Sequence, residues 1–142
     1  MRLRVAAAEA QAVRPLPAVG AKNYMVNPTG VVGALAVSFA NAIISGDFEA
    51  AHALLSESLK GAWPPVRLRA KFAAMIDYGD GPADDVELIN VDDMAAWESR
   101  EPADIGWAYV AISGEGFNEA VMVIVAHEGS RDTIRALEWG RP

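Results

Sequence analysis

The sequence predicts an α+β domain in which three N-terminal helices pack on an antiparallel sheet. Two observations support this fold class. Apolar residues recur at helical spacing from Val31 to Leu59 and again from Leu68 to Ile76. After Asp85 the apolar spacing changes to two, and turn residues separate short apolar runs. A run of helices followed by a run of strands is typical of helices that cover one face of an antiparallel sheet.

The first helix is expected from Thr29 to Ser45. Asn27 or Thr29 can cap its N-terminus, because a side-chain oxygen there accepts a hydrogen bond from an unpaired amide. Gly46 ends it, since glycine readily adopts the left-handed conformation that follows many helices. The expected core positions share one helical face: Val32, Leu35, Ala36, Phe39, Ala42 and Ile43.

Two further helices are expected to follow. Asp47 caps a second helix that runs to Leu59 and stops at Gly61. The segment Trp63-Pro64-Pro65 opens the third, because proline is tolerated in the first turn of a helix. A break rich in glycine and aspartate, at 79–85, separates this helix from the strands.

Four strands are expected, at 86–91, 105–113, 119–127 and 133–139. Tight turns join the last three, so they form an antiparallel meander. The run 119–127 is apolar on both faces and is therefore expected at the centre of the sheet. In the last strand, Arg135 and Trp139 are four residues apart, so they are expected on one face with the cation stacked on the indole.

The 142 residues fit one domain, expected at 30–142, with a loosely structured arm at 1–29. Apolar residues make up 52% of the chain, which is enough for a core, and no apolar run is long enough to cross a bilayer. Glu9, Gln11 and Arg14 interrupt the alanine-rich start, which therefore makes a poor signal peptide. Without cysteine the chain has no thiol chemistry, and a cytoplasmic location is expected.

Acidic residues are concentrated in one part of the chain. The formal net charge is −7, which argues against a general nucleic-acid binder. Ten of the nineteen acids fall between Asp77 and Asp104, where only Arg100 opposes them. An acidic surface attracts a basic protein, and the alternative is a set of solvated loops that keep the chain soluble. The candidate partner-binding residues are Asp84, Asp85, Asp92 and Asp93. The segment 80–85 lacks calcium-loop spacing, so no metal site is expected.

The two predicted helices at 31–59 carry a recognisable motif. Its parts are Ala36-Val37-Ser38-Phe39-Ala40-Asn41-Ala42-Ile43, then Gly46-Asp47-Phe48-Glu49-Ala50-Ala51, then Leu54-Leu55-Ser56. Followed by a third helix and a closing meander, this motif resembles the NTF2-like (cystatin-like α+β) superfamily over residues 31–142. The resemblance implies a cone, in which three helices pack on a curved antiparallel sheet around a pocket, and it implies a homodimer. It implies no single function, because the superfamily includes isomerases, dehydratases, cyclases, ligand carriers, transport factors and bacterial immunity proteins.

Enzymes of this superfamily place Asp, His, Tyr or Arg inside the cone, and no Asp–His or Tyr–Asp pair of this chain matches the motif positions. The candidate catalytic residues are His52, Asp77, Tyr109 and His127. An imidazole at the cone mouth is a candidate general base, and an aspartate held against aromatic walls is a candidate proton carrier. The simpler interpretation makes each of them a surface or boundary residue.

Large aromatic side chains are the candidates for a ligand-binding pocket, because small-molecule sites are mostly apolar. The candidate lining residues are Trp63, Phe72, Tyr78, Trp107 and Tyr109. The alternative places most of them in the core, since a domain of this size needs aromatic volume inside. No nucleotide or cofactor motif is present in the sequence, and no cofactor is expected.

These observations favour a binding domain over an enzyme. The expected partner is a basic protein, as for an immunity-type inhibitor of a basic toxin, or a small apolar ligand in the cone. The alternative is an isomerase, dehydratase or cyclase acting on a small apolar molecule. A homodimer is compatible with either function, and neither nucleic acid nor a membrane is expected as a partner.

Overall fold

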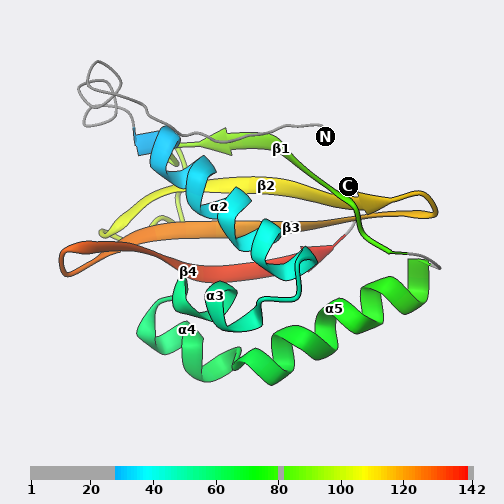
Figure 1. Cartoon of the computed structure of the whole chain (residues 1–142). Coiled ribbons are helices and arrows are strands. Elements are labelled where there is room, and N and C mark those ends of the chain that lie inside the picture. The colour runs from blue at the N-terminus through cyan, green and yellow to red at the C-terminus, as the bar shows by residue number, and fades with distance from the viewer. Residues whose placement is uncertain (1–27, 80–81, 141–142) are drawn as a thin grey trace, which may run out of the picture.

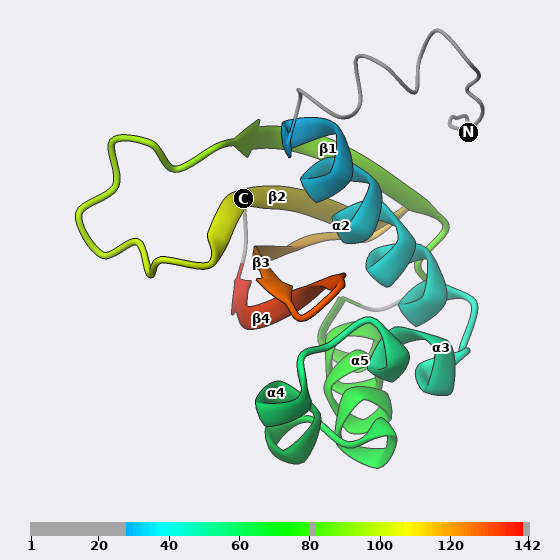
Figure 2. The same ribbon diagram turned by 90° about the vertical axis from the view of Figure 1, so that its left-hand side faces the viewer.

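The computed structural model describes residues 28–79 and 82–140. Helices come first and a four-stranded antiparallel sheet follows, so the α+β prediction is confirmed. The helix α2 crosses one face of the sheet, while α3, α4 and α5 gather beside the β4 edge (Figures 1 and 2). Of the arm predicted at 1–29, only Pro28 and Thr29 are described, and they begin α2.

The helix α2, Pro28–Ile44, is held to the sheet by one apolar face. Val32, Ala36, Phe39 and Ile43 are fully buried at helical spacing, as expected. Gly46 ends the helix with φ +80°, and its N–H donates to the carbonyl of Ile43 (3.1 Å). This confirms the predicted helix end, whereas Thr29 lies inside the first turn instead of capping it, and Asn27 is outside the described residues.

The predicted second helix is divided in two, so the described chain has four helices where three were expected. Asp47 caps α3, Phe48–Ala53, by accepting the amide of Ala50 (3.1 Å). Ser56 caps α4, Glu57–Ala62, which continues through Gly61. Between them, the fully buried Leu55 forms a bridge to Ile134 of β4, and this tertiary contact interrupts the helix.

The last helix, α5, comprises Pro65–Gly79 and follows Pro64 as expected. Leu68 and Met75 are its buried positions, and Phe72 is half-buried between them. The same helix contacts α3 through a tilted ring pair, Phe48 with Phe72, whose centroids lie 6.2 Å apart. It therefore forms the outer layer beside the β4 edge (Figure 2).

The strands are β1 (Asp85–Asp92), β2 (Asp104–Gly114), β3 (Phe117–Glu128) and β4 (Arg131–Gly140), in the spatial order β1-β2-β3-β4. This is the predicted meander, and β3 has a neighbour on each side. Each ladder contains one register shift, at which one residue has no partner on the neighbouring strand. The extra residue is Ile89 in the β1–β2 ladder, Ile105 in the β2–β3 ladder and Arg135 in the β3–β4 ladder. Such bulges change the face on which the following residues lie.

The core lies between the sheet and the helices. Alternate residues of the two central strands are fully buried there: Ala108, Val110, Ile112, Val121, Val123 and Val125. The sheet is not strongly curled, so the closed cone expected from the resemblance is not observed. Because side chains fill the space under α2, the helix-facing side of the sheet is a packed core.

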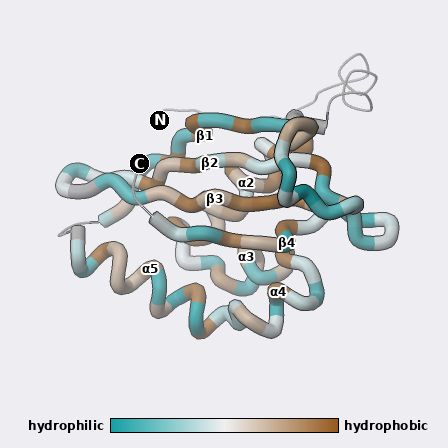
Figure 3. Tube along the Cα trace, turned by 180° about the vertical axis from the view of Figure 1, so that it is seen from behind, coloured by the Kyte–Doolittle hydropathy of each residue, from teal (hydrophilic) through white to brown (hydrophobic). Residues whose placement is uncertain are grey.

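No described helix covers the opposite face of the sheet (Figure 3). The register places Trp107, Ile124 and Ala136 side by side on it, with Tyr109 opposite Met122 in the next row. The connection from β1 to β2 extends on this side, away from α2 (Figure 2).

Candidate functional site

The strand β1 is an open edge of the sheet. Among the described strands it pairs only with β2. The opposite edge is closed in part, because the amide of Ser56 donates to the carbonyl of Ile134 (2.8 Å) and the amide of Ile134 donates to the carbonyl of Leu54 (3.0 Å). The outer side of β1 therefore offers backbone N–H and C=O groups that no described segment pairs with.

The middle of β1 is the most exposed part of the sheet. Its residues 87–90 are all exposed, including Leu88 at 38% and Ile89 at 49%. Leu88 faces α2, since a Cβ added at Gly33 would meet its Cδ2 at 3.1 Å. Ile89 occupies the register shift, which places an apolar side chain at the edge itself.

The four candidate partner-binding aspartates lie in two pairs at opposite ends of β1. Asp85 is the first residue of the strand and Asp84 precedes it, while Asp92 is the last residue and Asp93 follows it. Asp92 lies seven positions after Asp85, which is about 23 Å at the rise of a β-strand. The exposed Glu87 lies between the pairs. These five carboxylates, named the β1 acids below, form a line along the edge instead of a single cluster.

A turn fixes the carboxylates at the end of β1. One oxygen of Asp92 accepts the amide of Met94 (2.8 Å), and one oxygen of Asp93 accepts the amide of Ala95 (2.9 Å). Met94 has φ +64°, an uncommon conformation for a residue with a side chain, and that side chain is buried. Over the ranges that the structure describes, none of the β1 acids forms an ion pair with a cation.

Asp104 has a different role from the other acids of the 77–104 stretch. Its buried carboxylate accepts two hydrogen bonds from Arg135, at 2.5 and 2.7 Å, and one from the amide of Glu101 at 2.8 Å. The guanidinium of Arg100 donates to its backbone carbonyl (2.8 Å). This network ties the β1–β2 connection to β4. The side-chain hydrogen bond from Arg135 lowers the pKa of Asp104, and the same hydrogen bond raises the pKa of Arg135.

The four candidate catalytic residues are not brought together. His52 lies on α3 and donates from Nε2 to the carbonyl of Lys60 (3.3 Å). His127 is the penultimate residue of β3, and its Nδ1 lies 2.6 Å from a carboxylate oxygen of Asp132. Asp77 is exposed on α5, and Tyr109 lies on the face of the sheet opposite α2. No two of the four therefore share a site, and the geometry assembles no acid–base pair from them.

The five candidate ligand-lining aromatics are also dispersed. Trp63 packs on Trp139, with ring centroids 5.8 Å apart, and Tyr78 is exposed on α5. Trp107 and Tyr109 are half-buried on the sheet face opposite α2. Phe72 lines a groove beside α5. The pocket predicted from these residues is therefore not formed by them together.

The predicted stacking of Arg135 on Trp139 is wrong. The ladder pairs Ile134 with Val125 and Ala136 with Ile124, so Arg135 is an extra residue that has no opposite residue on β3. The bulge turns Arg135 toward Asp104, while Trp139 faces the helices and packs on Phe39 (6.0 Å between centroids). The ammonium of Lys71 lies 5.9 Å from the Trp139 ring instead.

Two residues of interest had no clear signal in the sequence. Ile89 follows another apolar residue, Leu88, in a run of mixed polar and apolar residues, and only the bulge shows that Ile89 has no partner on β2. Arg69 is one of three cations on α5, and only the structure places its guanidinium over the Phe48 ring, 4.9 Å from the centroid. Within the described ranges, no group of three metal-ligating side chains is present, and no helix has the length and apolar character to span a membrane.

Comparison with known proteins leaves these sites without an assigned role. No family model, no curated protein and no solved structure matches the chain. The structure itself shows an α+β architecture, with helices on a four-stranded antiparallel sheet that has an open β1 edge.

Proposed function

We propose that this chain is a protein-binding domain that takes a basic, extended segment of a partner along β1. The observation that carries the proposal is the combination of an open strand edge with five carboxylates along it, none of which forms an ion pair with a described cation. A strand edge supplies affinity through backbone hydrogen bonds, and the side chains that flank it select the partner.

The charge of the edge supports a basic partner. Lysine or arginine side chains at alternate positions of an added strand point to the same face, where they can reach successive carboxylates. Complementary charge also raises the association rate and rejects acidic partners. For the same reason the β1 acids oppose edge-to-edge pairing of two copies, which is a common role of charge on edge strands.

The NTF2-like assignment is a further part of the proposal. The element order supports it, because helices precede a closing meander as in the resemblance drawn from the sequence. An immunity-type inhibitor of a basic toxin is one specific form of the proposed function. A partner held on the β1 edge does not require the deep cone, in agreement with a sheet that is not strongly curled.

The test uses a synthetic peptide of about ten residues in which lysine alternates with valine or threonine. We expect the peptide to bind and to slow hydrogen exchange of β1 amides, because an added strand pairs with them. Replacing Asp92→Asn and Asp93→Asn together should weaken binding about fivefold, since each exposed ion pair contributes roughly 0.5 kcal/mol. Fluorescence anisotropy at several salt concentrations measures the affinity.

A charge-matched control separates the edge from the net charge. The double variant Glu49→Gln with Glu115→Gln removes two exposed acids that lie on α3 and on the β2–β3 turn. We expect it to bind the peptide as the wild type does. Equal weakening by both double variants, or binding without protection of β1 amides, contradicts the proposal.

A further inference from the structure

A groove lies between the α2–α3 connection and α5. Its volume is about 470 Å³, within the usual range for small-molecule sites. The α2–α3 side contributes Ile44, Ser45, Gly46 and Phe48, and α5 contributes Arg69, Phe72, Ala73, Ile76 and Asp77. In the view of Figure 1 the two elements that line the groove, the end of α2 and α5, lie below the middle of the sheet.

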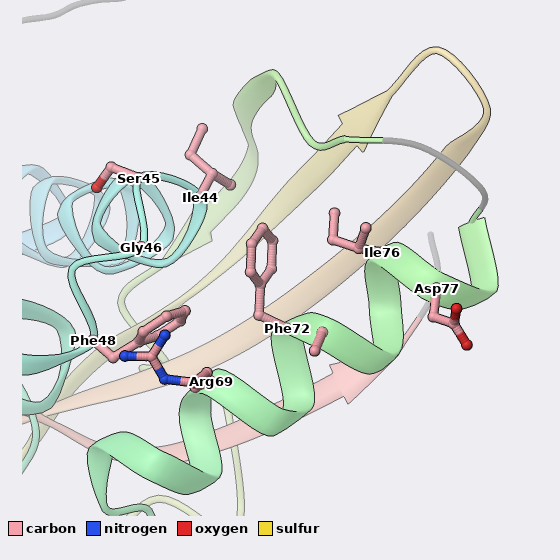
Figure 4. A pocket seen from close by; sticks show the side chains of 9 residues that line it. Ile44, Ser45, Gly46, Phe48, Arg69, Phe72, Ile76 and Asp77 are labelled. Atoms are coloured by element: carbon pink, nitrogen blue, oxygen red, sulfur yellow. The ribbon is translucent and has the colours of Figure 1, made fainter.

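The floor of the groove is apolar. Phe72 and Ile76 rise from α5 toward Ile44, and the ring of Phe48 closes the end near the α2–α3 connection (Figure 4). Phe48 is buried, whereas Ile44, Phe72 and Ile76 are only half-buried. An apolar molecule in the groove removes the exposed parts of these side chains from water, which is favourable in proportion to the area covered.

One cation stands at the end of this floor. The guanidinium carbon of Arg69 lies 4.9 Å from the centroid of the Phe48 ring. None of the described carboxylates forms an ion pair with Arg69. Contact with the ring restricts the side chain, so less conformational entropy is lost when the guanidinium binds a ligand. Its planar fork matches the two oxygens of a carboxylate.

Two further features affect ligand binding in the groove: the open space at Gly46, and the opposite charges of Arg69 and Asp77 along α5. Gly46, at φ +80°, has nothing within 4 Å of an added Cβ, so the mouth beside Ser45 is open. Asp77 lies eight residues after Arg69, which is about 12 Å along the helix. A ligand with one negative end is therefore attracted at Arg69 and repelled at Asp77, which sets its direction.

We propose that this groove is a binding site for a small amphiphile with an apolar body and one carboxylate, such as a medium-chain fatty acid. The carboxylate pairs with Arg69, and the chain lies over Phe72 toward Ile76. This site uses none of the β1 acids, so it stands or fails independently of the proposed protein partner.

The experiment compares dodecanoate with dodecan-1-ol, which has the same chain without the charge. Titration calorimetry measures the affinity, and amide chemical shifts locate the site. We expect dodecanoate to shift the amides of Gly46, Phe48 and Arg69, and Arg69→Gln to weaken its binding about tenfold because a charge-assisted pair is lost. Binding of dodecan-1-ol should be the same in the wild type and in Arg69→Gln.

Two further variants complete the test. Arg67→Gln removes the same charge from the same helix, but this guanidinium lies over Trp63, 3.9 Å from the centroid, and does not line the groove. We expect Arg67→Gln to bind dodecanoate as the wild type does. Ala73→Trp should fill the groove and abolish binding of both molecules. Absence of dodecanoate binding, shifts elsewhere in the domain, or equal losses in Arg69→Gln and Arg67→Gln overturn the proposal.

Discussion

Asp104 shows how a residue from an acidic stretch can be structural. Its carboxylate is inaccessible to solvent and holds Arg135, while the neighbouring Glu101 is exposed and lies farther from the same guanidinium, at 3.4 Å. A buried carboxylate with good hydrogen bonds is costly to remove, because its donors are left unpaired. The acids of one sequence stretch therefore divide into those that stabilise the fold and those that are free to meet a partner.

We predict that Asp104→Asn lowers the free energy of unfolding by about 2 kcal/mol, because hydrogen bonds to a charged group are lost and Arg135 loses its partner. Urea denaturation at pH 7 measures the change. Glu101→Gln is the control and should change the free energy of unfolding by less than about 0.5 kcal/mol, since an exposed ion pair contributes little. Similar effects in the two variants contradict the assignment of Asp104 as the anchor.

The same residue predicts a dependence on pH. The pKa of Asp104 is lowered in the folded chain, chiefly by the hydrogen bond from Arg135. A lowered folded pKa means that the stabilisation is present above the unfolded pKa, about 4, and is lost as the pH falls through the folded pKa. The difference in stability between wild type and Asp104→Asn should therefore be constant from pH 7 to about pH 5 and narrow at more acidic pH.

At the residue scale, side-chain faces could be predicted from the sequence only up to the nearest bulge. The period of two after Asp85 and the continuous apolar run at 119–127 correctly indicate strands, because both patterns reflect the alternation of side chains along an extended backbone. The different faces of Arg135 and Trp139 could not be predicted, because the position of an extra residue in a ladder depends on the partner strand. The same reason explains why Ile89 was not recognised as an edge residue.

Two glycines of neighbouring helices make different contributions to their elements. Gly46 has a positive φ after α2, whereas Gly61 lies inside α4 without one, and neither has an atom within 4 Å of an added Cβ. Steric contact therefore does not distinguish them, and only the backbone conformation does. We predict that Gly46→Ala lowers the free energy of unfolding by about 1 kcal/mol, the cost of a left-handed residue with a Cβ.

Gly61→Ala should instead raise the free energy of unfolding by about 0.5 kcal/mol, because alanine loses less backbone entropy in a helix. Thermal and urea denaturation of both variants test the pair together. Opposite signs support Gly46 as the residue that ends α2 and Gly61 as an ordinary helical position. A loss of stability in Gly61→Ala is incompatible with the conformation of α4 described above.

At the element scale, the order and type of the elements could be predicted because each depends on local periodicity and end signals. Asp47 and Gly46 act as predicted. The division between α3 and α4 could not be predicted in the same way, although Ser56 is a good capping residue. What interrupts the helix is the bridge from Leu55 to Ile134, a contact between segments far apart in the sequence.

For the whole molecule, the absence of a strongly curled sheet changes where ligands and partners are expected. A cone would have gathered His52, Tyr109 and the aromatic residues around one pocket. Instead, side chains fill the helix-facing side of the sheet, and the remaining candidate surfaces are the β1 edge, the α5 groove and the face of the sheet opposite α2. Sheet curvature depends on bulges and on long-range packing, so local patterns carry little information about it.

The face of the sheet opposite α2 is the surface on which we predict the homodimer. Trp107, Ala136 and Met122 are partly exposed apolar side chains on this face, and they surround Ile124, which is only 7% exposed. Contiguous apolar surfaces of this kind usually mark an interaction site. Sedimentation velocity should show a dimer, and Met122→Lys should shift it toward the monomer because a charge in the interface must be desolvated. Val66→Lys, on an exposed position of α5, is the control and should leave the dimer intact.

Salt distinguishes this self-association from partner binding. Each copy carries a net charge of −7, so two copies repel each other and added salt should strengthen the dimer by screening that repulsion. Binding of a basic segment to the β1 acids should weaken over the same range of salt, because there the charges attract. Sedimentation velocity and peptide titration of the same protein preparation, each at 50 and 300 mM NaCl, measure the two trends. A dimer that dissociates as salt rises points to ion pairs across its interface and contradicts an apolar sheet-to-sheet contact.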